Sequence, residues 1–320
     1  MVQKPAFLIT IDTEGDNLWV NTKDILTQNA NYLFRFQQLC EKYNFKPTYL
    51  TNYEMAISPA YVSFARDVIE RKQGEVGMHL HAWNSPPLYS LTADDDKYKP
   101  YLIEYPLDIM RQKIAFMTNL LEDTFGVKMV SHRAGRWAFN KHYAQLLHEF
   151  GYLVDCSVTP YIDWSGVLGD PNGDGGSDFS RFPDGAYFMD LENIAKVGTS
   201  TLLQVPMSTR LKHGTLQNTF KQLYNGVRGK KKPLSVRWLR PKGGNVDEMK
   251  RVVEQCLNEG KNYVEFMLHS SEFMPGGSPT FSDEESIELL YSDLDELFVW
   301  LSQRTQGMTM AEFYKNEVIC

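Results

Sequence analysis

The sequence predicts an α/β fold in which seven or eight parallel strands form a distorted (β/α) barrel. Short apolar segments alternate along the chain with longer amphipathic ones, which is the pattern of repeated βα units. Three of the expected helices end just before a glycine, at Gly126, Gly151 and Gly260, where helices commonly stop. A length of 320 residues suits one barrel, so we expect a single domain over residues 1–320.

The expected strands are short, apolar and bounded by turn residues. In chain order they cover residues 7–12, 47–51, 75–81, 129–132, 153–156, 202–207, 263–269 and 308–313. The expected helices carry apolar residues at spacings of three and four, which gives each of them one apolar face. In chain order they cover residues 25–43, 59–71, 107–125, 141–150, 246–258 and 284–303.

Two segments interrupt this alternation of strands and helices. Residues 161–186 contain six glycines, which predicts a long loop of the kind that often serves function. Residues 210–244 form a basic insertion: eleven Lys and Arg residues and no Asp or Glu lie between Asn193 and Asn245, although the whole chain has a formal charge of −7. Such a segment can contact an anionic lipid-linked intermediate, or it can be a solvated loop. The acidic chain carries no motif that reads nucleic acid, so we expect no nucleic-acid partner.

Composition and cysteine spacing indicate an ordinary globular protein of a reducing compartment. Hydrophobic residues make up 42% of the chain and charged residues 23%. The four cysteines are far apart and form no CxxC pair, which argues against a disulfide framework and against a cysteine zinc site. We expect no signal peptide and no transmembrane segment, because no apolar run approaches the roughly 18 residues that a span needs. These features predict a cytoplasmic protein.

Polar residues follow several of the expected strands, and in a βα barrel the reacting groups lie at the carboxyl ends of strands. Asp12 and Glu14 end the first strand and, being two residues apart, point to the same side of it. Two such carboxylates suit a metal ligand beside a general base. The alternative is a turn or a helix cap, for which Asp is also common.

Two histidines end the third strand. His79 and His81 are two residues apart and therefore project from one face. Imidazole nitrogens placed in this way can hold a divalent ion, and zinc is the usual choice for imidazole combined with carboxylate. We therefore predict a divalent metal cofactor, with Zn²⁺ as the expected ion.

Further candidates follow later strands. Arg133 and Asp155 end neighbouring strands, and an arginine beside Asp12 would keep that carboxylate ionised. The alternative for Arg133 and Asp155 is a structural salt bridge beneath the loops. His269 ends the late strand and could serve as a general acid or as a third imidazole ligand.

The order of these segments resembles the polysaccharide deacetylase superfamily, which is carbohydrate esterase family 4-like and shares the NodB homology. The resemblance covers the chain up to about residue 160 and the stretch around His269. It implies that Asp12 is the catalytic base, that Arg133 orients this base, and that His269 is the acid. Asp155 falls roughly where the family supplies a residue that supports the acid.

Two motifs depart from the family pattern. The usual adjacent Asp pair is spread over Asp12 and Glu14, which leaves Glu14 at the position of the metal-binding Asp. The usual His-x-x-x-His is His79-x-His81, with Trp83 at the position of the second histidine. With these changes the chain resembles a divergent cytoplasmic branch of deacetylase-like proteins from O-antigen or capsule gene clusters.

The resemblance implies a metal-dependent hydrolase that removes an acetyl group from an N-acetylated sugar or polysaccharide precursor. Trp83, Arg136 and Trp137 are the candidate substrate contacts. A hydrolase of small cyclic amides and a non-catalytic, glycan-binding relative are alternatives. A glycosidase that uses Asp12 with Glu272 would leave the histidine pair unexplained.

Overall fold

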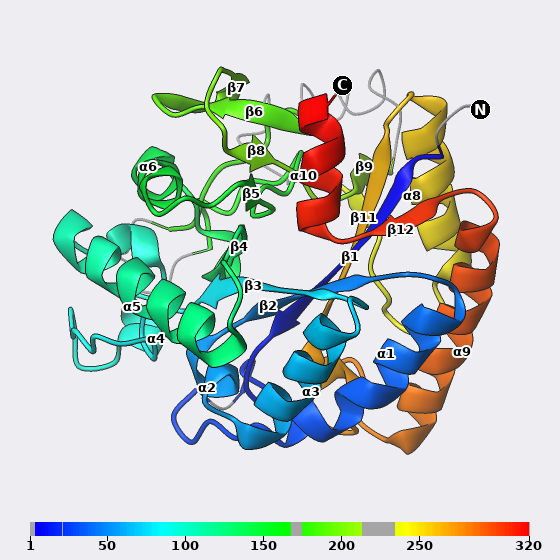
Figure 1. The fold of residues 1–320 in the computed structure, drawn as a ribbon, viewed down its shortest axis with the longest axis horizontal. Coiled ribbons are helices and arrows are strands. Elements are labelled where there is room, and N and C mark those ends of the chain that lie inside the picture. Colours follow the sequence, from blue (N-terminus) through cyan, green and yellow to red (C-terminus); the bar gives the residue numbers. More distant parts are fainter. Residues whose placement is uncertain (1–3, 21, 168–174, 213–233, 320) are drawn as a thin grey trace, which may run out of the picture.

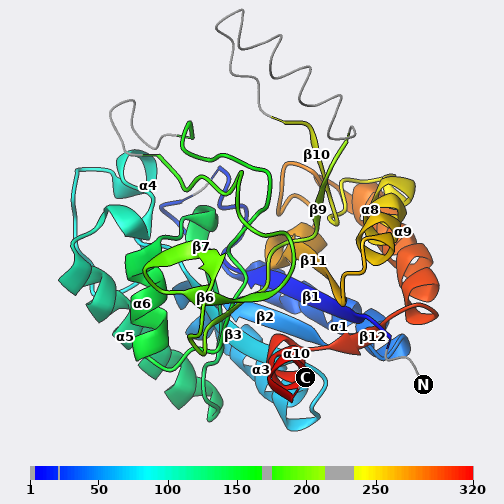
Figure 2. The same cartoon turned by 90° about the horizontal axis from the view of Figure 1, so that it is seen from above.

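The computed structural model describes residues 4–20, 22–167, 175–212 and 234–319, which form a curled sheet surrounded by helices (Figures 1 and 2). The parallel strands lie in the order β11-β1-β2-β3-β4-β5-β8, and β12 pairs in parallel with the start of β1. Their bounds are β1 Ala6–Thr13, β2 Pro47–Thr51, β3 Glu75–Leu80, β4 Ser131–Ala134, β5 Val154–Asp155, β8 Leu203–Gln204, β11 Tyr263–His269 and β12 Gln306–Met308. This arrangement confirms the predicted distorted (β/α) barrel.

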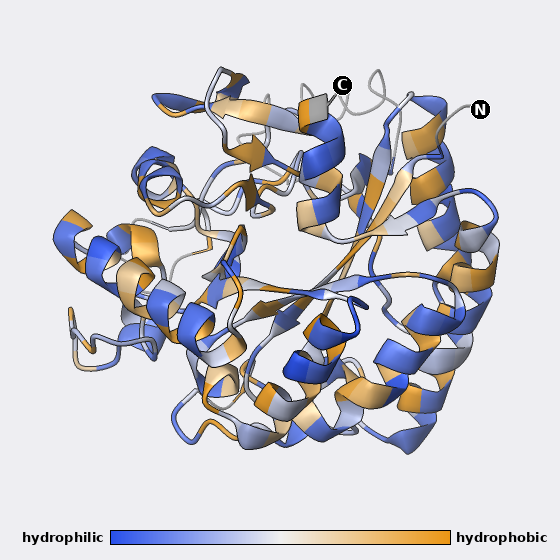
Figure 3. Ribbon diagram, in the orientation of Figure 1, coloured by the Kyte–Doolittle hydropathy of each residue, from blue (hydrophilic) through white to orange (hydrophobic). Residues whose placement is uncertain are grey.

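The predicted helices are present in the expected order. They are α1 Leu33–Lys42 with the preceding η1 Gln28–Tyr32, α3 Pro59–Glu70, α5 Leu107–Phe125, α6 Lys141–Glu149, α8 Val246–Asn258 and α9 Glu284–Ser302. Short turns complete the connections: α2 Tyr53–Ala56, α4 Asp95–Tyr98, η2 Leu102–Glu104, η3 Gly135–Trp137 and η4 Ser270–Phe273. Apolar residues of the helices and strands face one another and form the core (Figure 3).

The prediction of a last strand over residues 308–313 is wrong for most of these residues. The chain leaves β12 at Met308 and enters helix α10, Met310–Ile319. A capping box starts this helix: the Thr309 hydroxyl accepts a hydrogen bond from Glu312 N at 3.2 Å, and the Glu312 carboxylate accepts one from Thr309 N at 3.1 Å. These reciprocal bonds satisfy the first helical N–H groups and outweigh the apolar composition of the segment.

Strands that the sequence did not predict follow the glycine-rich loop and form part of the basic insertion. After the glycine-rich loop, β6 Tyr187–Asp190 and β7 Asn193–Val197 form an antiparallel hairpin at the edge of the sheet. The described ends of that loop pair with each other, since Trp164 N donates to Ser177 O at 3.0 Å. In the basic insertion, β9 Thr209–Leu211 pairs with β10 Val236–Trp238 and lies beside α8 (Figure 2).

The described ends of the basic insertion are partly neutralised within the chain. Arg210 lies 2.9 Å from Glu259, and Arg240 lies 3.0 Å from Glu272. Lys212 and Lys242 both approach Glu248, at 3.9 Å and 4.0 Å. The remaining cations that define the basic cluster, from residue 221 to residue 232, fall outside the described residues.

Side-chain hydrogen bonds bridge the two ends of the parallel sheet. The Tyr263 hydroxyl of β11 donates to Pro206 O at 2.7 Å, and Glu265 N donates to Ser208 Oγ at 2.8 Å. Pro206 and Ser208 lie just beyond β8, so these bonds bring β11 beside the chain that leaves the other end of the parallel sheet. Hydrogen bonds that involve side chains thus nearly close the barrel. In a regular barrel, backbone hydrogen bonds between neighbouring strands would close it.

The register of the strands gathers the polar strand ends. Asp12 of β1 lies opposite His269 of β11, and His79 of β3 lies opposite Arg133 of β4.

No described helix has the length and apolar character that a membrane span requires.

The hydrogen bond between Glu265 N and Ser208 Oγ provides a test of the near closure. Ser208→Ala leaves a buried backbone N–H without its acceptor, so we expect the free energy of unfolding to fall by about 1–3 kcal/mol. Ser292→Ala, at an exposed position of α9, is the matched control and should change stability far less. The measurement is urea unfolding followed by circular dichroism, and equal stability of the two variants would contradict the bridging role.

Candidate metal and catalytic site

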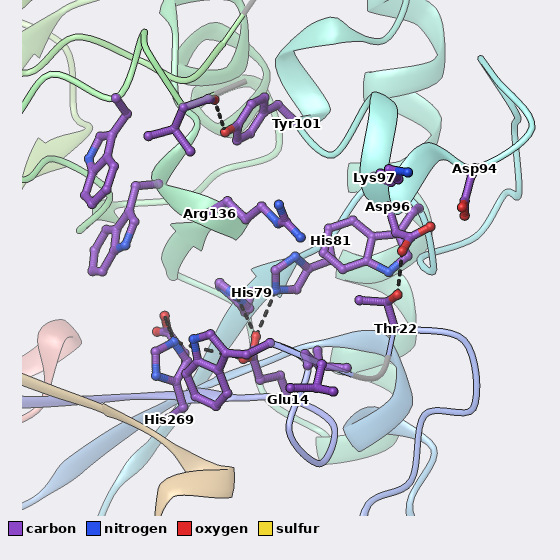
Figure 4. Close-up of a pocket in the computed structure, with 18 of the residues that line it drawn as sticks. Glu14, Thr22, His79, His81, Asp94, Asp96, Lys97, Tyr101, Arg136 and His269 are labelled. Carbon is purple, nitrogen blue, oxygen red and sulfur yellow. Dashed lines mark hydrogen bonds and ion pairs between the residues drawn. The ribbon is translucent and has the colours of Figure 1, made fainter. Parts of the chain in front are cut away.

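A cavity of about 720 Å³ opens at the carboxyl ends of the strands (Figure 4). Eight of the ten predicted site residues line it: Asp12, Glu14, His79, His81, Trp83, Arg136, Trp137 and His269. Arg133 and Asp155 do not line the cavity and are fully buried. The sequence therefore located the cavity, although its lining residues end or follow strands β1, β3, β4 and β11, which come from distant parts of the chain.

Three buried side chains converge on one point of the cavity floor. His81 Nε2 lies 2.8 Å from Glu14 Oε2 and 3.2 Å from His79 Nε2, and His79 Nε2 lies 3.5 Å from the same Glu14 oxygen. One ligand atom from each of the three residues lies within 4.8 Å of the other two. Two imidazoles and a carboxylate arranged in this way are a donor set that a divalent transition metal binds.

The hydrogen bonds and charges around these residues suit a cation. His79 Nδ1 donates to Arg133 O at 2.9 Å, which leaves Nε2 as the nitrogen that faces Glu14. Burial lowers the pKa of His81 to about 4, so this imidazole is neutral at physiological pH, as a ligand must be. Burial alone would lower the pKa of His79, but the negative charges of Asp12 and Glu14 outweigh it and raise that pKa.

A close approach of the backbone makes room for His81. A Cβ atom on Gly135 would lie 2.9 Å from His81 Nδ1 and 2.5 Å from Leu80 O, so only glycine fits at this position. The next two residues, Arg136 and Trp137, have positive φ angles of 53° and 61°, which L-residues rarely adopt. This strained turn directs both residues toward the cavity that they line.

The buried guanidinium of Arg133 holds Asp12. Arg133 Nη1 donates to Asp12 Oδ1 at 2.6 Å, while Nη2 donates to Thr10 Oγ1 at 2.7 Å and also pairs with Glu265. Burial alone would raise the pKa of Asp12, but Arg133, with His79 and His269, lowers it below its usual value. Asp12 is therefore ionised, and its Oδ2 is the oxygen that Arg133 leaves free.

His269 lies at the same floor, with Nε2 3.9 Å from Asp12 Oδ2 and 4.0 Å from Glu14 Oε1. Its Nδ1 lies 3.0 Å from Glu272 Oε2 and 3.1 Å from a nitrogen of Arg240, which itself pairs with Glu272. We assign the Nδ1 proton to the bond with Glu272, because the same carboxylate supplies the acceptor for Arg240. Burial opposes ionisation of Glu272, but Arg240 and then His269 outweigh it and lower its pKa.

The structure does not bring Asp155 to His269. The Asp155 carboxylate accepts hydrogen bonds from His132 Nδ1 at 2.7 Å and from Ser157 N at 2.9 Å, and His132 Nε2 lies 2.8 Å from the Tyr143 hydroxyl. Asp155 is thus part of a buried polar cluster between β4, β5 and α6. The residue that contacts His269 Nδ1 is Glu272, only three positions further along the chain.

Two polar residues after β2 were missed in the sequence. Glu54 accepts hydrogen bonds from Gly15 N at 2.6 Å and from Asn84 Nδ2 at 2.8 Å, and Asn52 Oδ1 accepts one from His81 N at 3.3 Å. Burial raises the pKa of Glu54 to about 7. These two residues tie the loop after β1 to the loop after β3, next to the predicted ligands. The signal was present, since Asn52 and Glu54 directly follow a strand end.

Aromatic side chains form much of the cavity wall. Trp83 and Trp137 were predicted there, and Trp19, Tyr101 and Trp164 join them. The Trp19 ring meets His269 edge-on, with ring centroids 4.7 Å apart. The three additional residues come from loops, whose course hydrophobic periodicity does not predict.

The fold is similar to solved structures of carbohydrate-active proteins, whereas no family model and no curated protein matches the chain. A protein assigned as a glycoside hydrolase/deacetylase from Parabacteroides distasonis aligns with a TM-score of 0.64 and 11% identity, over 98% of this chain and 71% of its own. A protein assigned as a polysaccharide deacetylase from Mycobacterium smegmatis aligns with a TM-score of 0.56 and 13% identity, over 99% and 91%.

A 4-alpha-glucanotransferase from Thermococcus litoralis aligns with a TM-score of 0.55 and 13% identity, over 98% of this chain and 40% of its own. These similarities agree with the barrel that the resemblance implied. Because proteins described by different reactions share the fold, the reaction has to be argued from the residues of the site.

Metal content tests the convergence of Glu14, His79 and His81. We expect about one divalent ion per chain in the purified protein and none in His79→Ala/His81→Ala, because the carboxylate alone is a poor site for such an ion. The control is His142→Ala/His148→Ala, which removes two exposed histidines of α6 and should keep the ion. The measurement is plasma mass spectrometry, and equal metal content in the two double variants would refute the site.

Proposed function

We propose that this protein is a metal-dependent hydrolase that removes the acetyl group from an N-acetylated sugar or polysaccharide precursor. One observation carries the proposal: a Glu-His-His donor set, an ionised aspartate and a further histidine meet in one aromatic-lined cavity. Amide hydrolysis needs a group that activates water, a group that stabilises charge on the carbonyl oxygen and an acid that protonates the amine. The cavity offers a candidate for each task.

The ion belongs with Glu14, His79 and His81. We propose Zn²⁺, because imidazole and carboxylate donors together suit zinc. When bound, a divalent ion polarises a carbonyl oxygen and lowers the pKa of a water molecule. Burial alone would raise the pKa of Glu14, but hydrogen bonds with His79 and His81 bring it well below its usual value, so this ligand carries its negative charge.

Asp12 is the proposed general base. Its Oδ1 is held by Arg133, so the carboxylate is fixed in orientation and its Oδ2 can accept a proton from the attacking water. Glu14 directly follows the strand that carries Asp12, which keeps the proposed base close to the ligand set. The pairing with Arg133 is shielded from solvent, since the guanidinium is fully buried.

His269 is the proposed general acid. With its Nδ1 proton directed to Glu272, its Nε2 faces the cavity floor, where it can donate a proton to the departing sugar nitrogen. The ionised Glu272 accepts the Nδ1 proton and orients the ring. The rings of Trp83 and Trp137 are candidate stacking surfaces for the sugar.

The rival glycosidase reading is disfavoured by the position of Glu272. Glycoside hydrolysis by two carboxylates requires both of them to face the sugar. Glu272 is 1% exposed, does not line the cavity and is paired with Arg240 and His269. Hydrolysis of a cyclic amide would use the same ligand set, and its ring-opened product would distinguish it from acetate release.

Three finer assignments stay predictions from the sequence. They are the cytoplasmic location, the link to O-antigen or capsule synthesis, and the contact of the basic insertion with an anionic lipid-linked intermediate. Salt-sensitive binding to anionic liposomes that is lost when Lys230, Lys231 and Lys232 are changed to Gln would support the lipid contact.

Acetate release from N-acetylated sugars tests the proposed reaction, with Asp12→Asn as the central variant. Asparagine keeps the size of the side chain and removes the base, so we expect kcat to fall by about 10²- to 10⁴-fold while the metal content stays unchanged. Asp247→Asn, in the first turn of α8, is the matched control. Undiminished turnover in Asp12→Asn would refute the base. Glycan binding without acetate release by the parent protein would identify a non-catalytic relative.

Comparison of Glu272→Gln with Asp155→Asn tests which carboxylate supports the acid. We expect Glu272→Gln to lower kcat on the N-acetyl amide by about 10- to 100-fold, in the range seen when residues that orient active groups are changed. An aryl acetate needs no acid for its leaving group, so its hydrolysis should change much less. Asp155→Asn should lower thermal stability and spare the ratio of amide to ester activity. The opposite pattern would indicate that Asp155 is the carboxylate that supports the acid His269.

A further inference from the structure

Arg136 places in the wall of the cavity a positive charge that has no ion-pair partner among the described residues. The other arginine that lines the cavity, Arg240, is neutralised by Glu272 at 3.0 Å. Arg133, in the strand just before it, is paired with Asp12. The Arg136 guanidinium makes no ion pair or hydrogen bond with any described residue. It lies over the ring of Trp83, whose centroid is 5.2 Å from the guanidinium carbon.

The backbone holds Arg136 in this position at the expense of strain. Its φ and ψ angles are 53° and 27°, and Trp137 follows with a φ of 61°. Gly135 precedes them at a point where a Cβ atom would collide with Leu80 O. Strained turns that direct a charged side chain into a cavity are typical of functional sites. In Figure 4 the Arg136 side chain extends into the cavity above His81 and below Tyr101.

The contact with Trp83 leaves the N–H groups of Arg136 free. A guanidinium that lies over an aromatic ring uses its face, whereas its N–H donors point outward along its edge. This planar set of donors matches the two oxygens of a carboxylate or the oxygens of a phosphate. Arg136 is exposed, so water solvates its guanidinium in the free protein, and an anionic group of a ligand would replace that water with charge-assisted hydrogen bonds.

The carboxylates that line the cavity have partners of their own. Asp12 is held by Arg133, and Glu14 belongs to the ligand set. Asp94 pairs with Lys23 at 3.4 Å, and Asp96 accepts a hydrogen bond from Thr22. None of these four lining carboxylates pairs with Arg136, so within the described part of the chain its charge is available to a ligand.

We propose that Arg136 recognises an anionic substituent of the substrate, so that the preferred substrate is an acidic N-acetylated sugar that bears a carboxylate or a phosphate. The inference rests on the proposed deacetylase function and narrows its substrate class. Arg136 would bind the substituent while the acetyl group lies at the floor near His81 and Asp12. It is a specificity residue, which contacts the substrate away from the reacting bond.

Direct binding to the metal-loaded protein tests the proposal independently of turnover. Isothermal titration calorimetry compares three probes: N-acetylglucosamine, its uronic acid and its 1-phosphate. We expect at least one acidic probe to bind about 10- to 100-fold more tightly than the neutral sugar, as a charge-assisted bidentate contact provides. The preferred acidic probe tells carboxylate recognition from phosphate recognition.

Arg136→Gln should bring the ratio of acidic to neutral affinity close to one, and Arg136→Lys should keep part of it because the charge is retained without the planar donors. Arg251→Gln, an exposed arginine of α8 outside the cavity, is the matched control and should keep the full ratio. Circular dichroism confirms that each variant is folded. A neutral sugar that binds as tightly as both acids, no measurable binding of either acid, or an acidic preference that survives in Arg136→Gln would overturn the proposal.

Acetate release, measured in parallel, separates this inference from the proposed function. An acidic preference that depends on Arg136 without acetate release would reject the deacetylase and keep the anion site. Acetate release from neutral sugars with an unchanged kcat/KM in Arg136→Gln would keep the deacetylase and reject the anion site.

Discussion

The site depends on one buried guanidinium. Arg133 extends from β4 across the barrel interior to Asp12 and Thr10 of β1 and to Glu265 of β11, and its Nε donates to Cys156 O at 3.2 Å, just beyond β5. A buried charge destabilises a protein unless it is paired, so these strands are held in one arrangement. Burial raises the pKa of Glu265 to about 8 despite Arg133, whereas Asp12 stays ionised.

The segment that carries Arg133 organises the cavity through its backbone as well as its side chain. The carbonyl oxygen of Arg133 accepts the Nδ1 proton of His79 and so orients that imidazole. Gly135, two residues further, has no Cβ and leaves room for the ring of His81. The two residues that follow, Arg136 and Trp137, have strained backbone angles and line the cavity wall. A single short stretch therefore positions Asp12, both imidazoles and part of the cavity wall.

Much of this arrangement could be predicted from the sequence, because parallel strands bring their carboxyl ends to one edge. Periodicity gave α5 and α8 with their observed bounds, and the polar strand ends gave most residues that line the cavity. Thr309 and Glu312 have the spacing of a capping box, which indicates the start of α10 in the sequence itself. The partner of His269 could not be predicted in this way, because side-chain direction decides it: Glu272 turns back onto the imidazole, while Asp155 turns to His132. The loop residues that line the cavity follow no period, so no pattern reveals them.

The fold leaves the reaction open, because the barrel is shared by a protein assigned as a polysaccharide deacetylase and by a glucanotransferase. The choice between these chemistries depends on which charges face the cavity. The glycosidase pair of Asp12 with Glu272 would need both carboxylates toward the sugar, and here Glu272 is turned away into pairs with Arg240 and His269. What faces the cavity is the free oxygen of Asp12, a carboxylate with two imidazoles, and the edge of His269. These groups suit attack of water on a carbonyl carbon with protonation of an amine, as in the proposed deacetylation. Arg136 has no ion-pair partner among the described residues, which favours an acidic sugar as the proposed substrate.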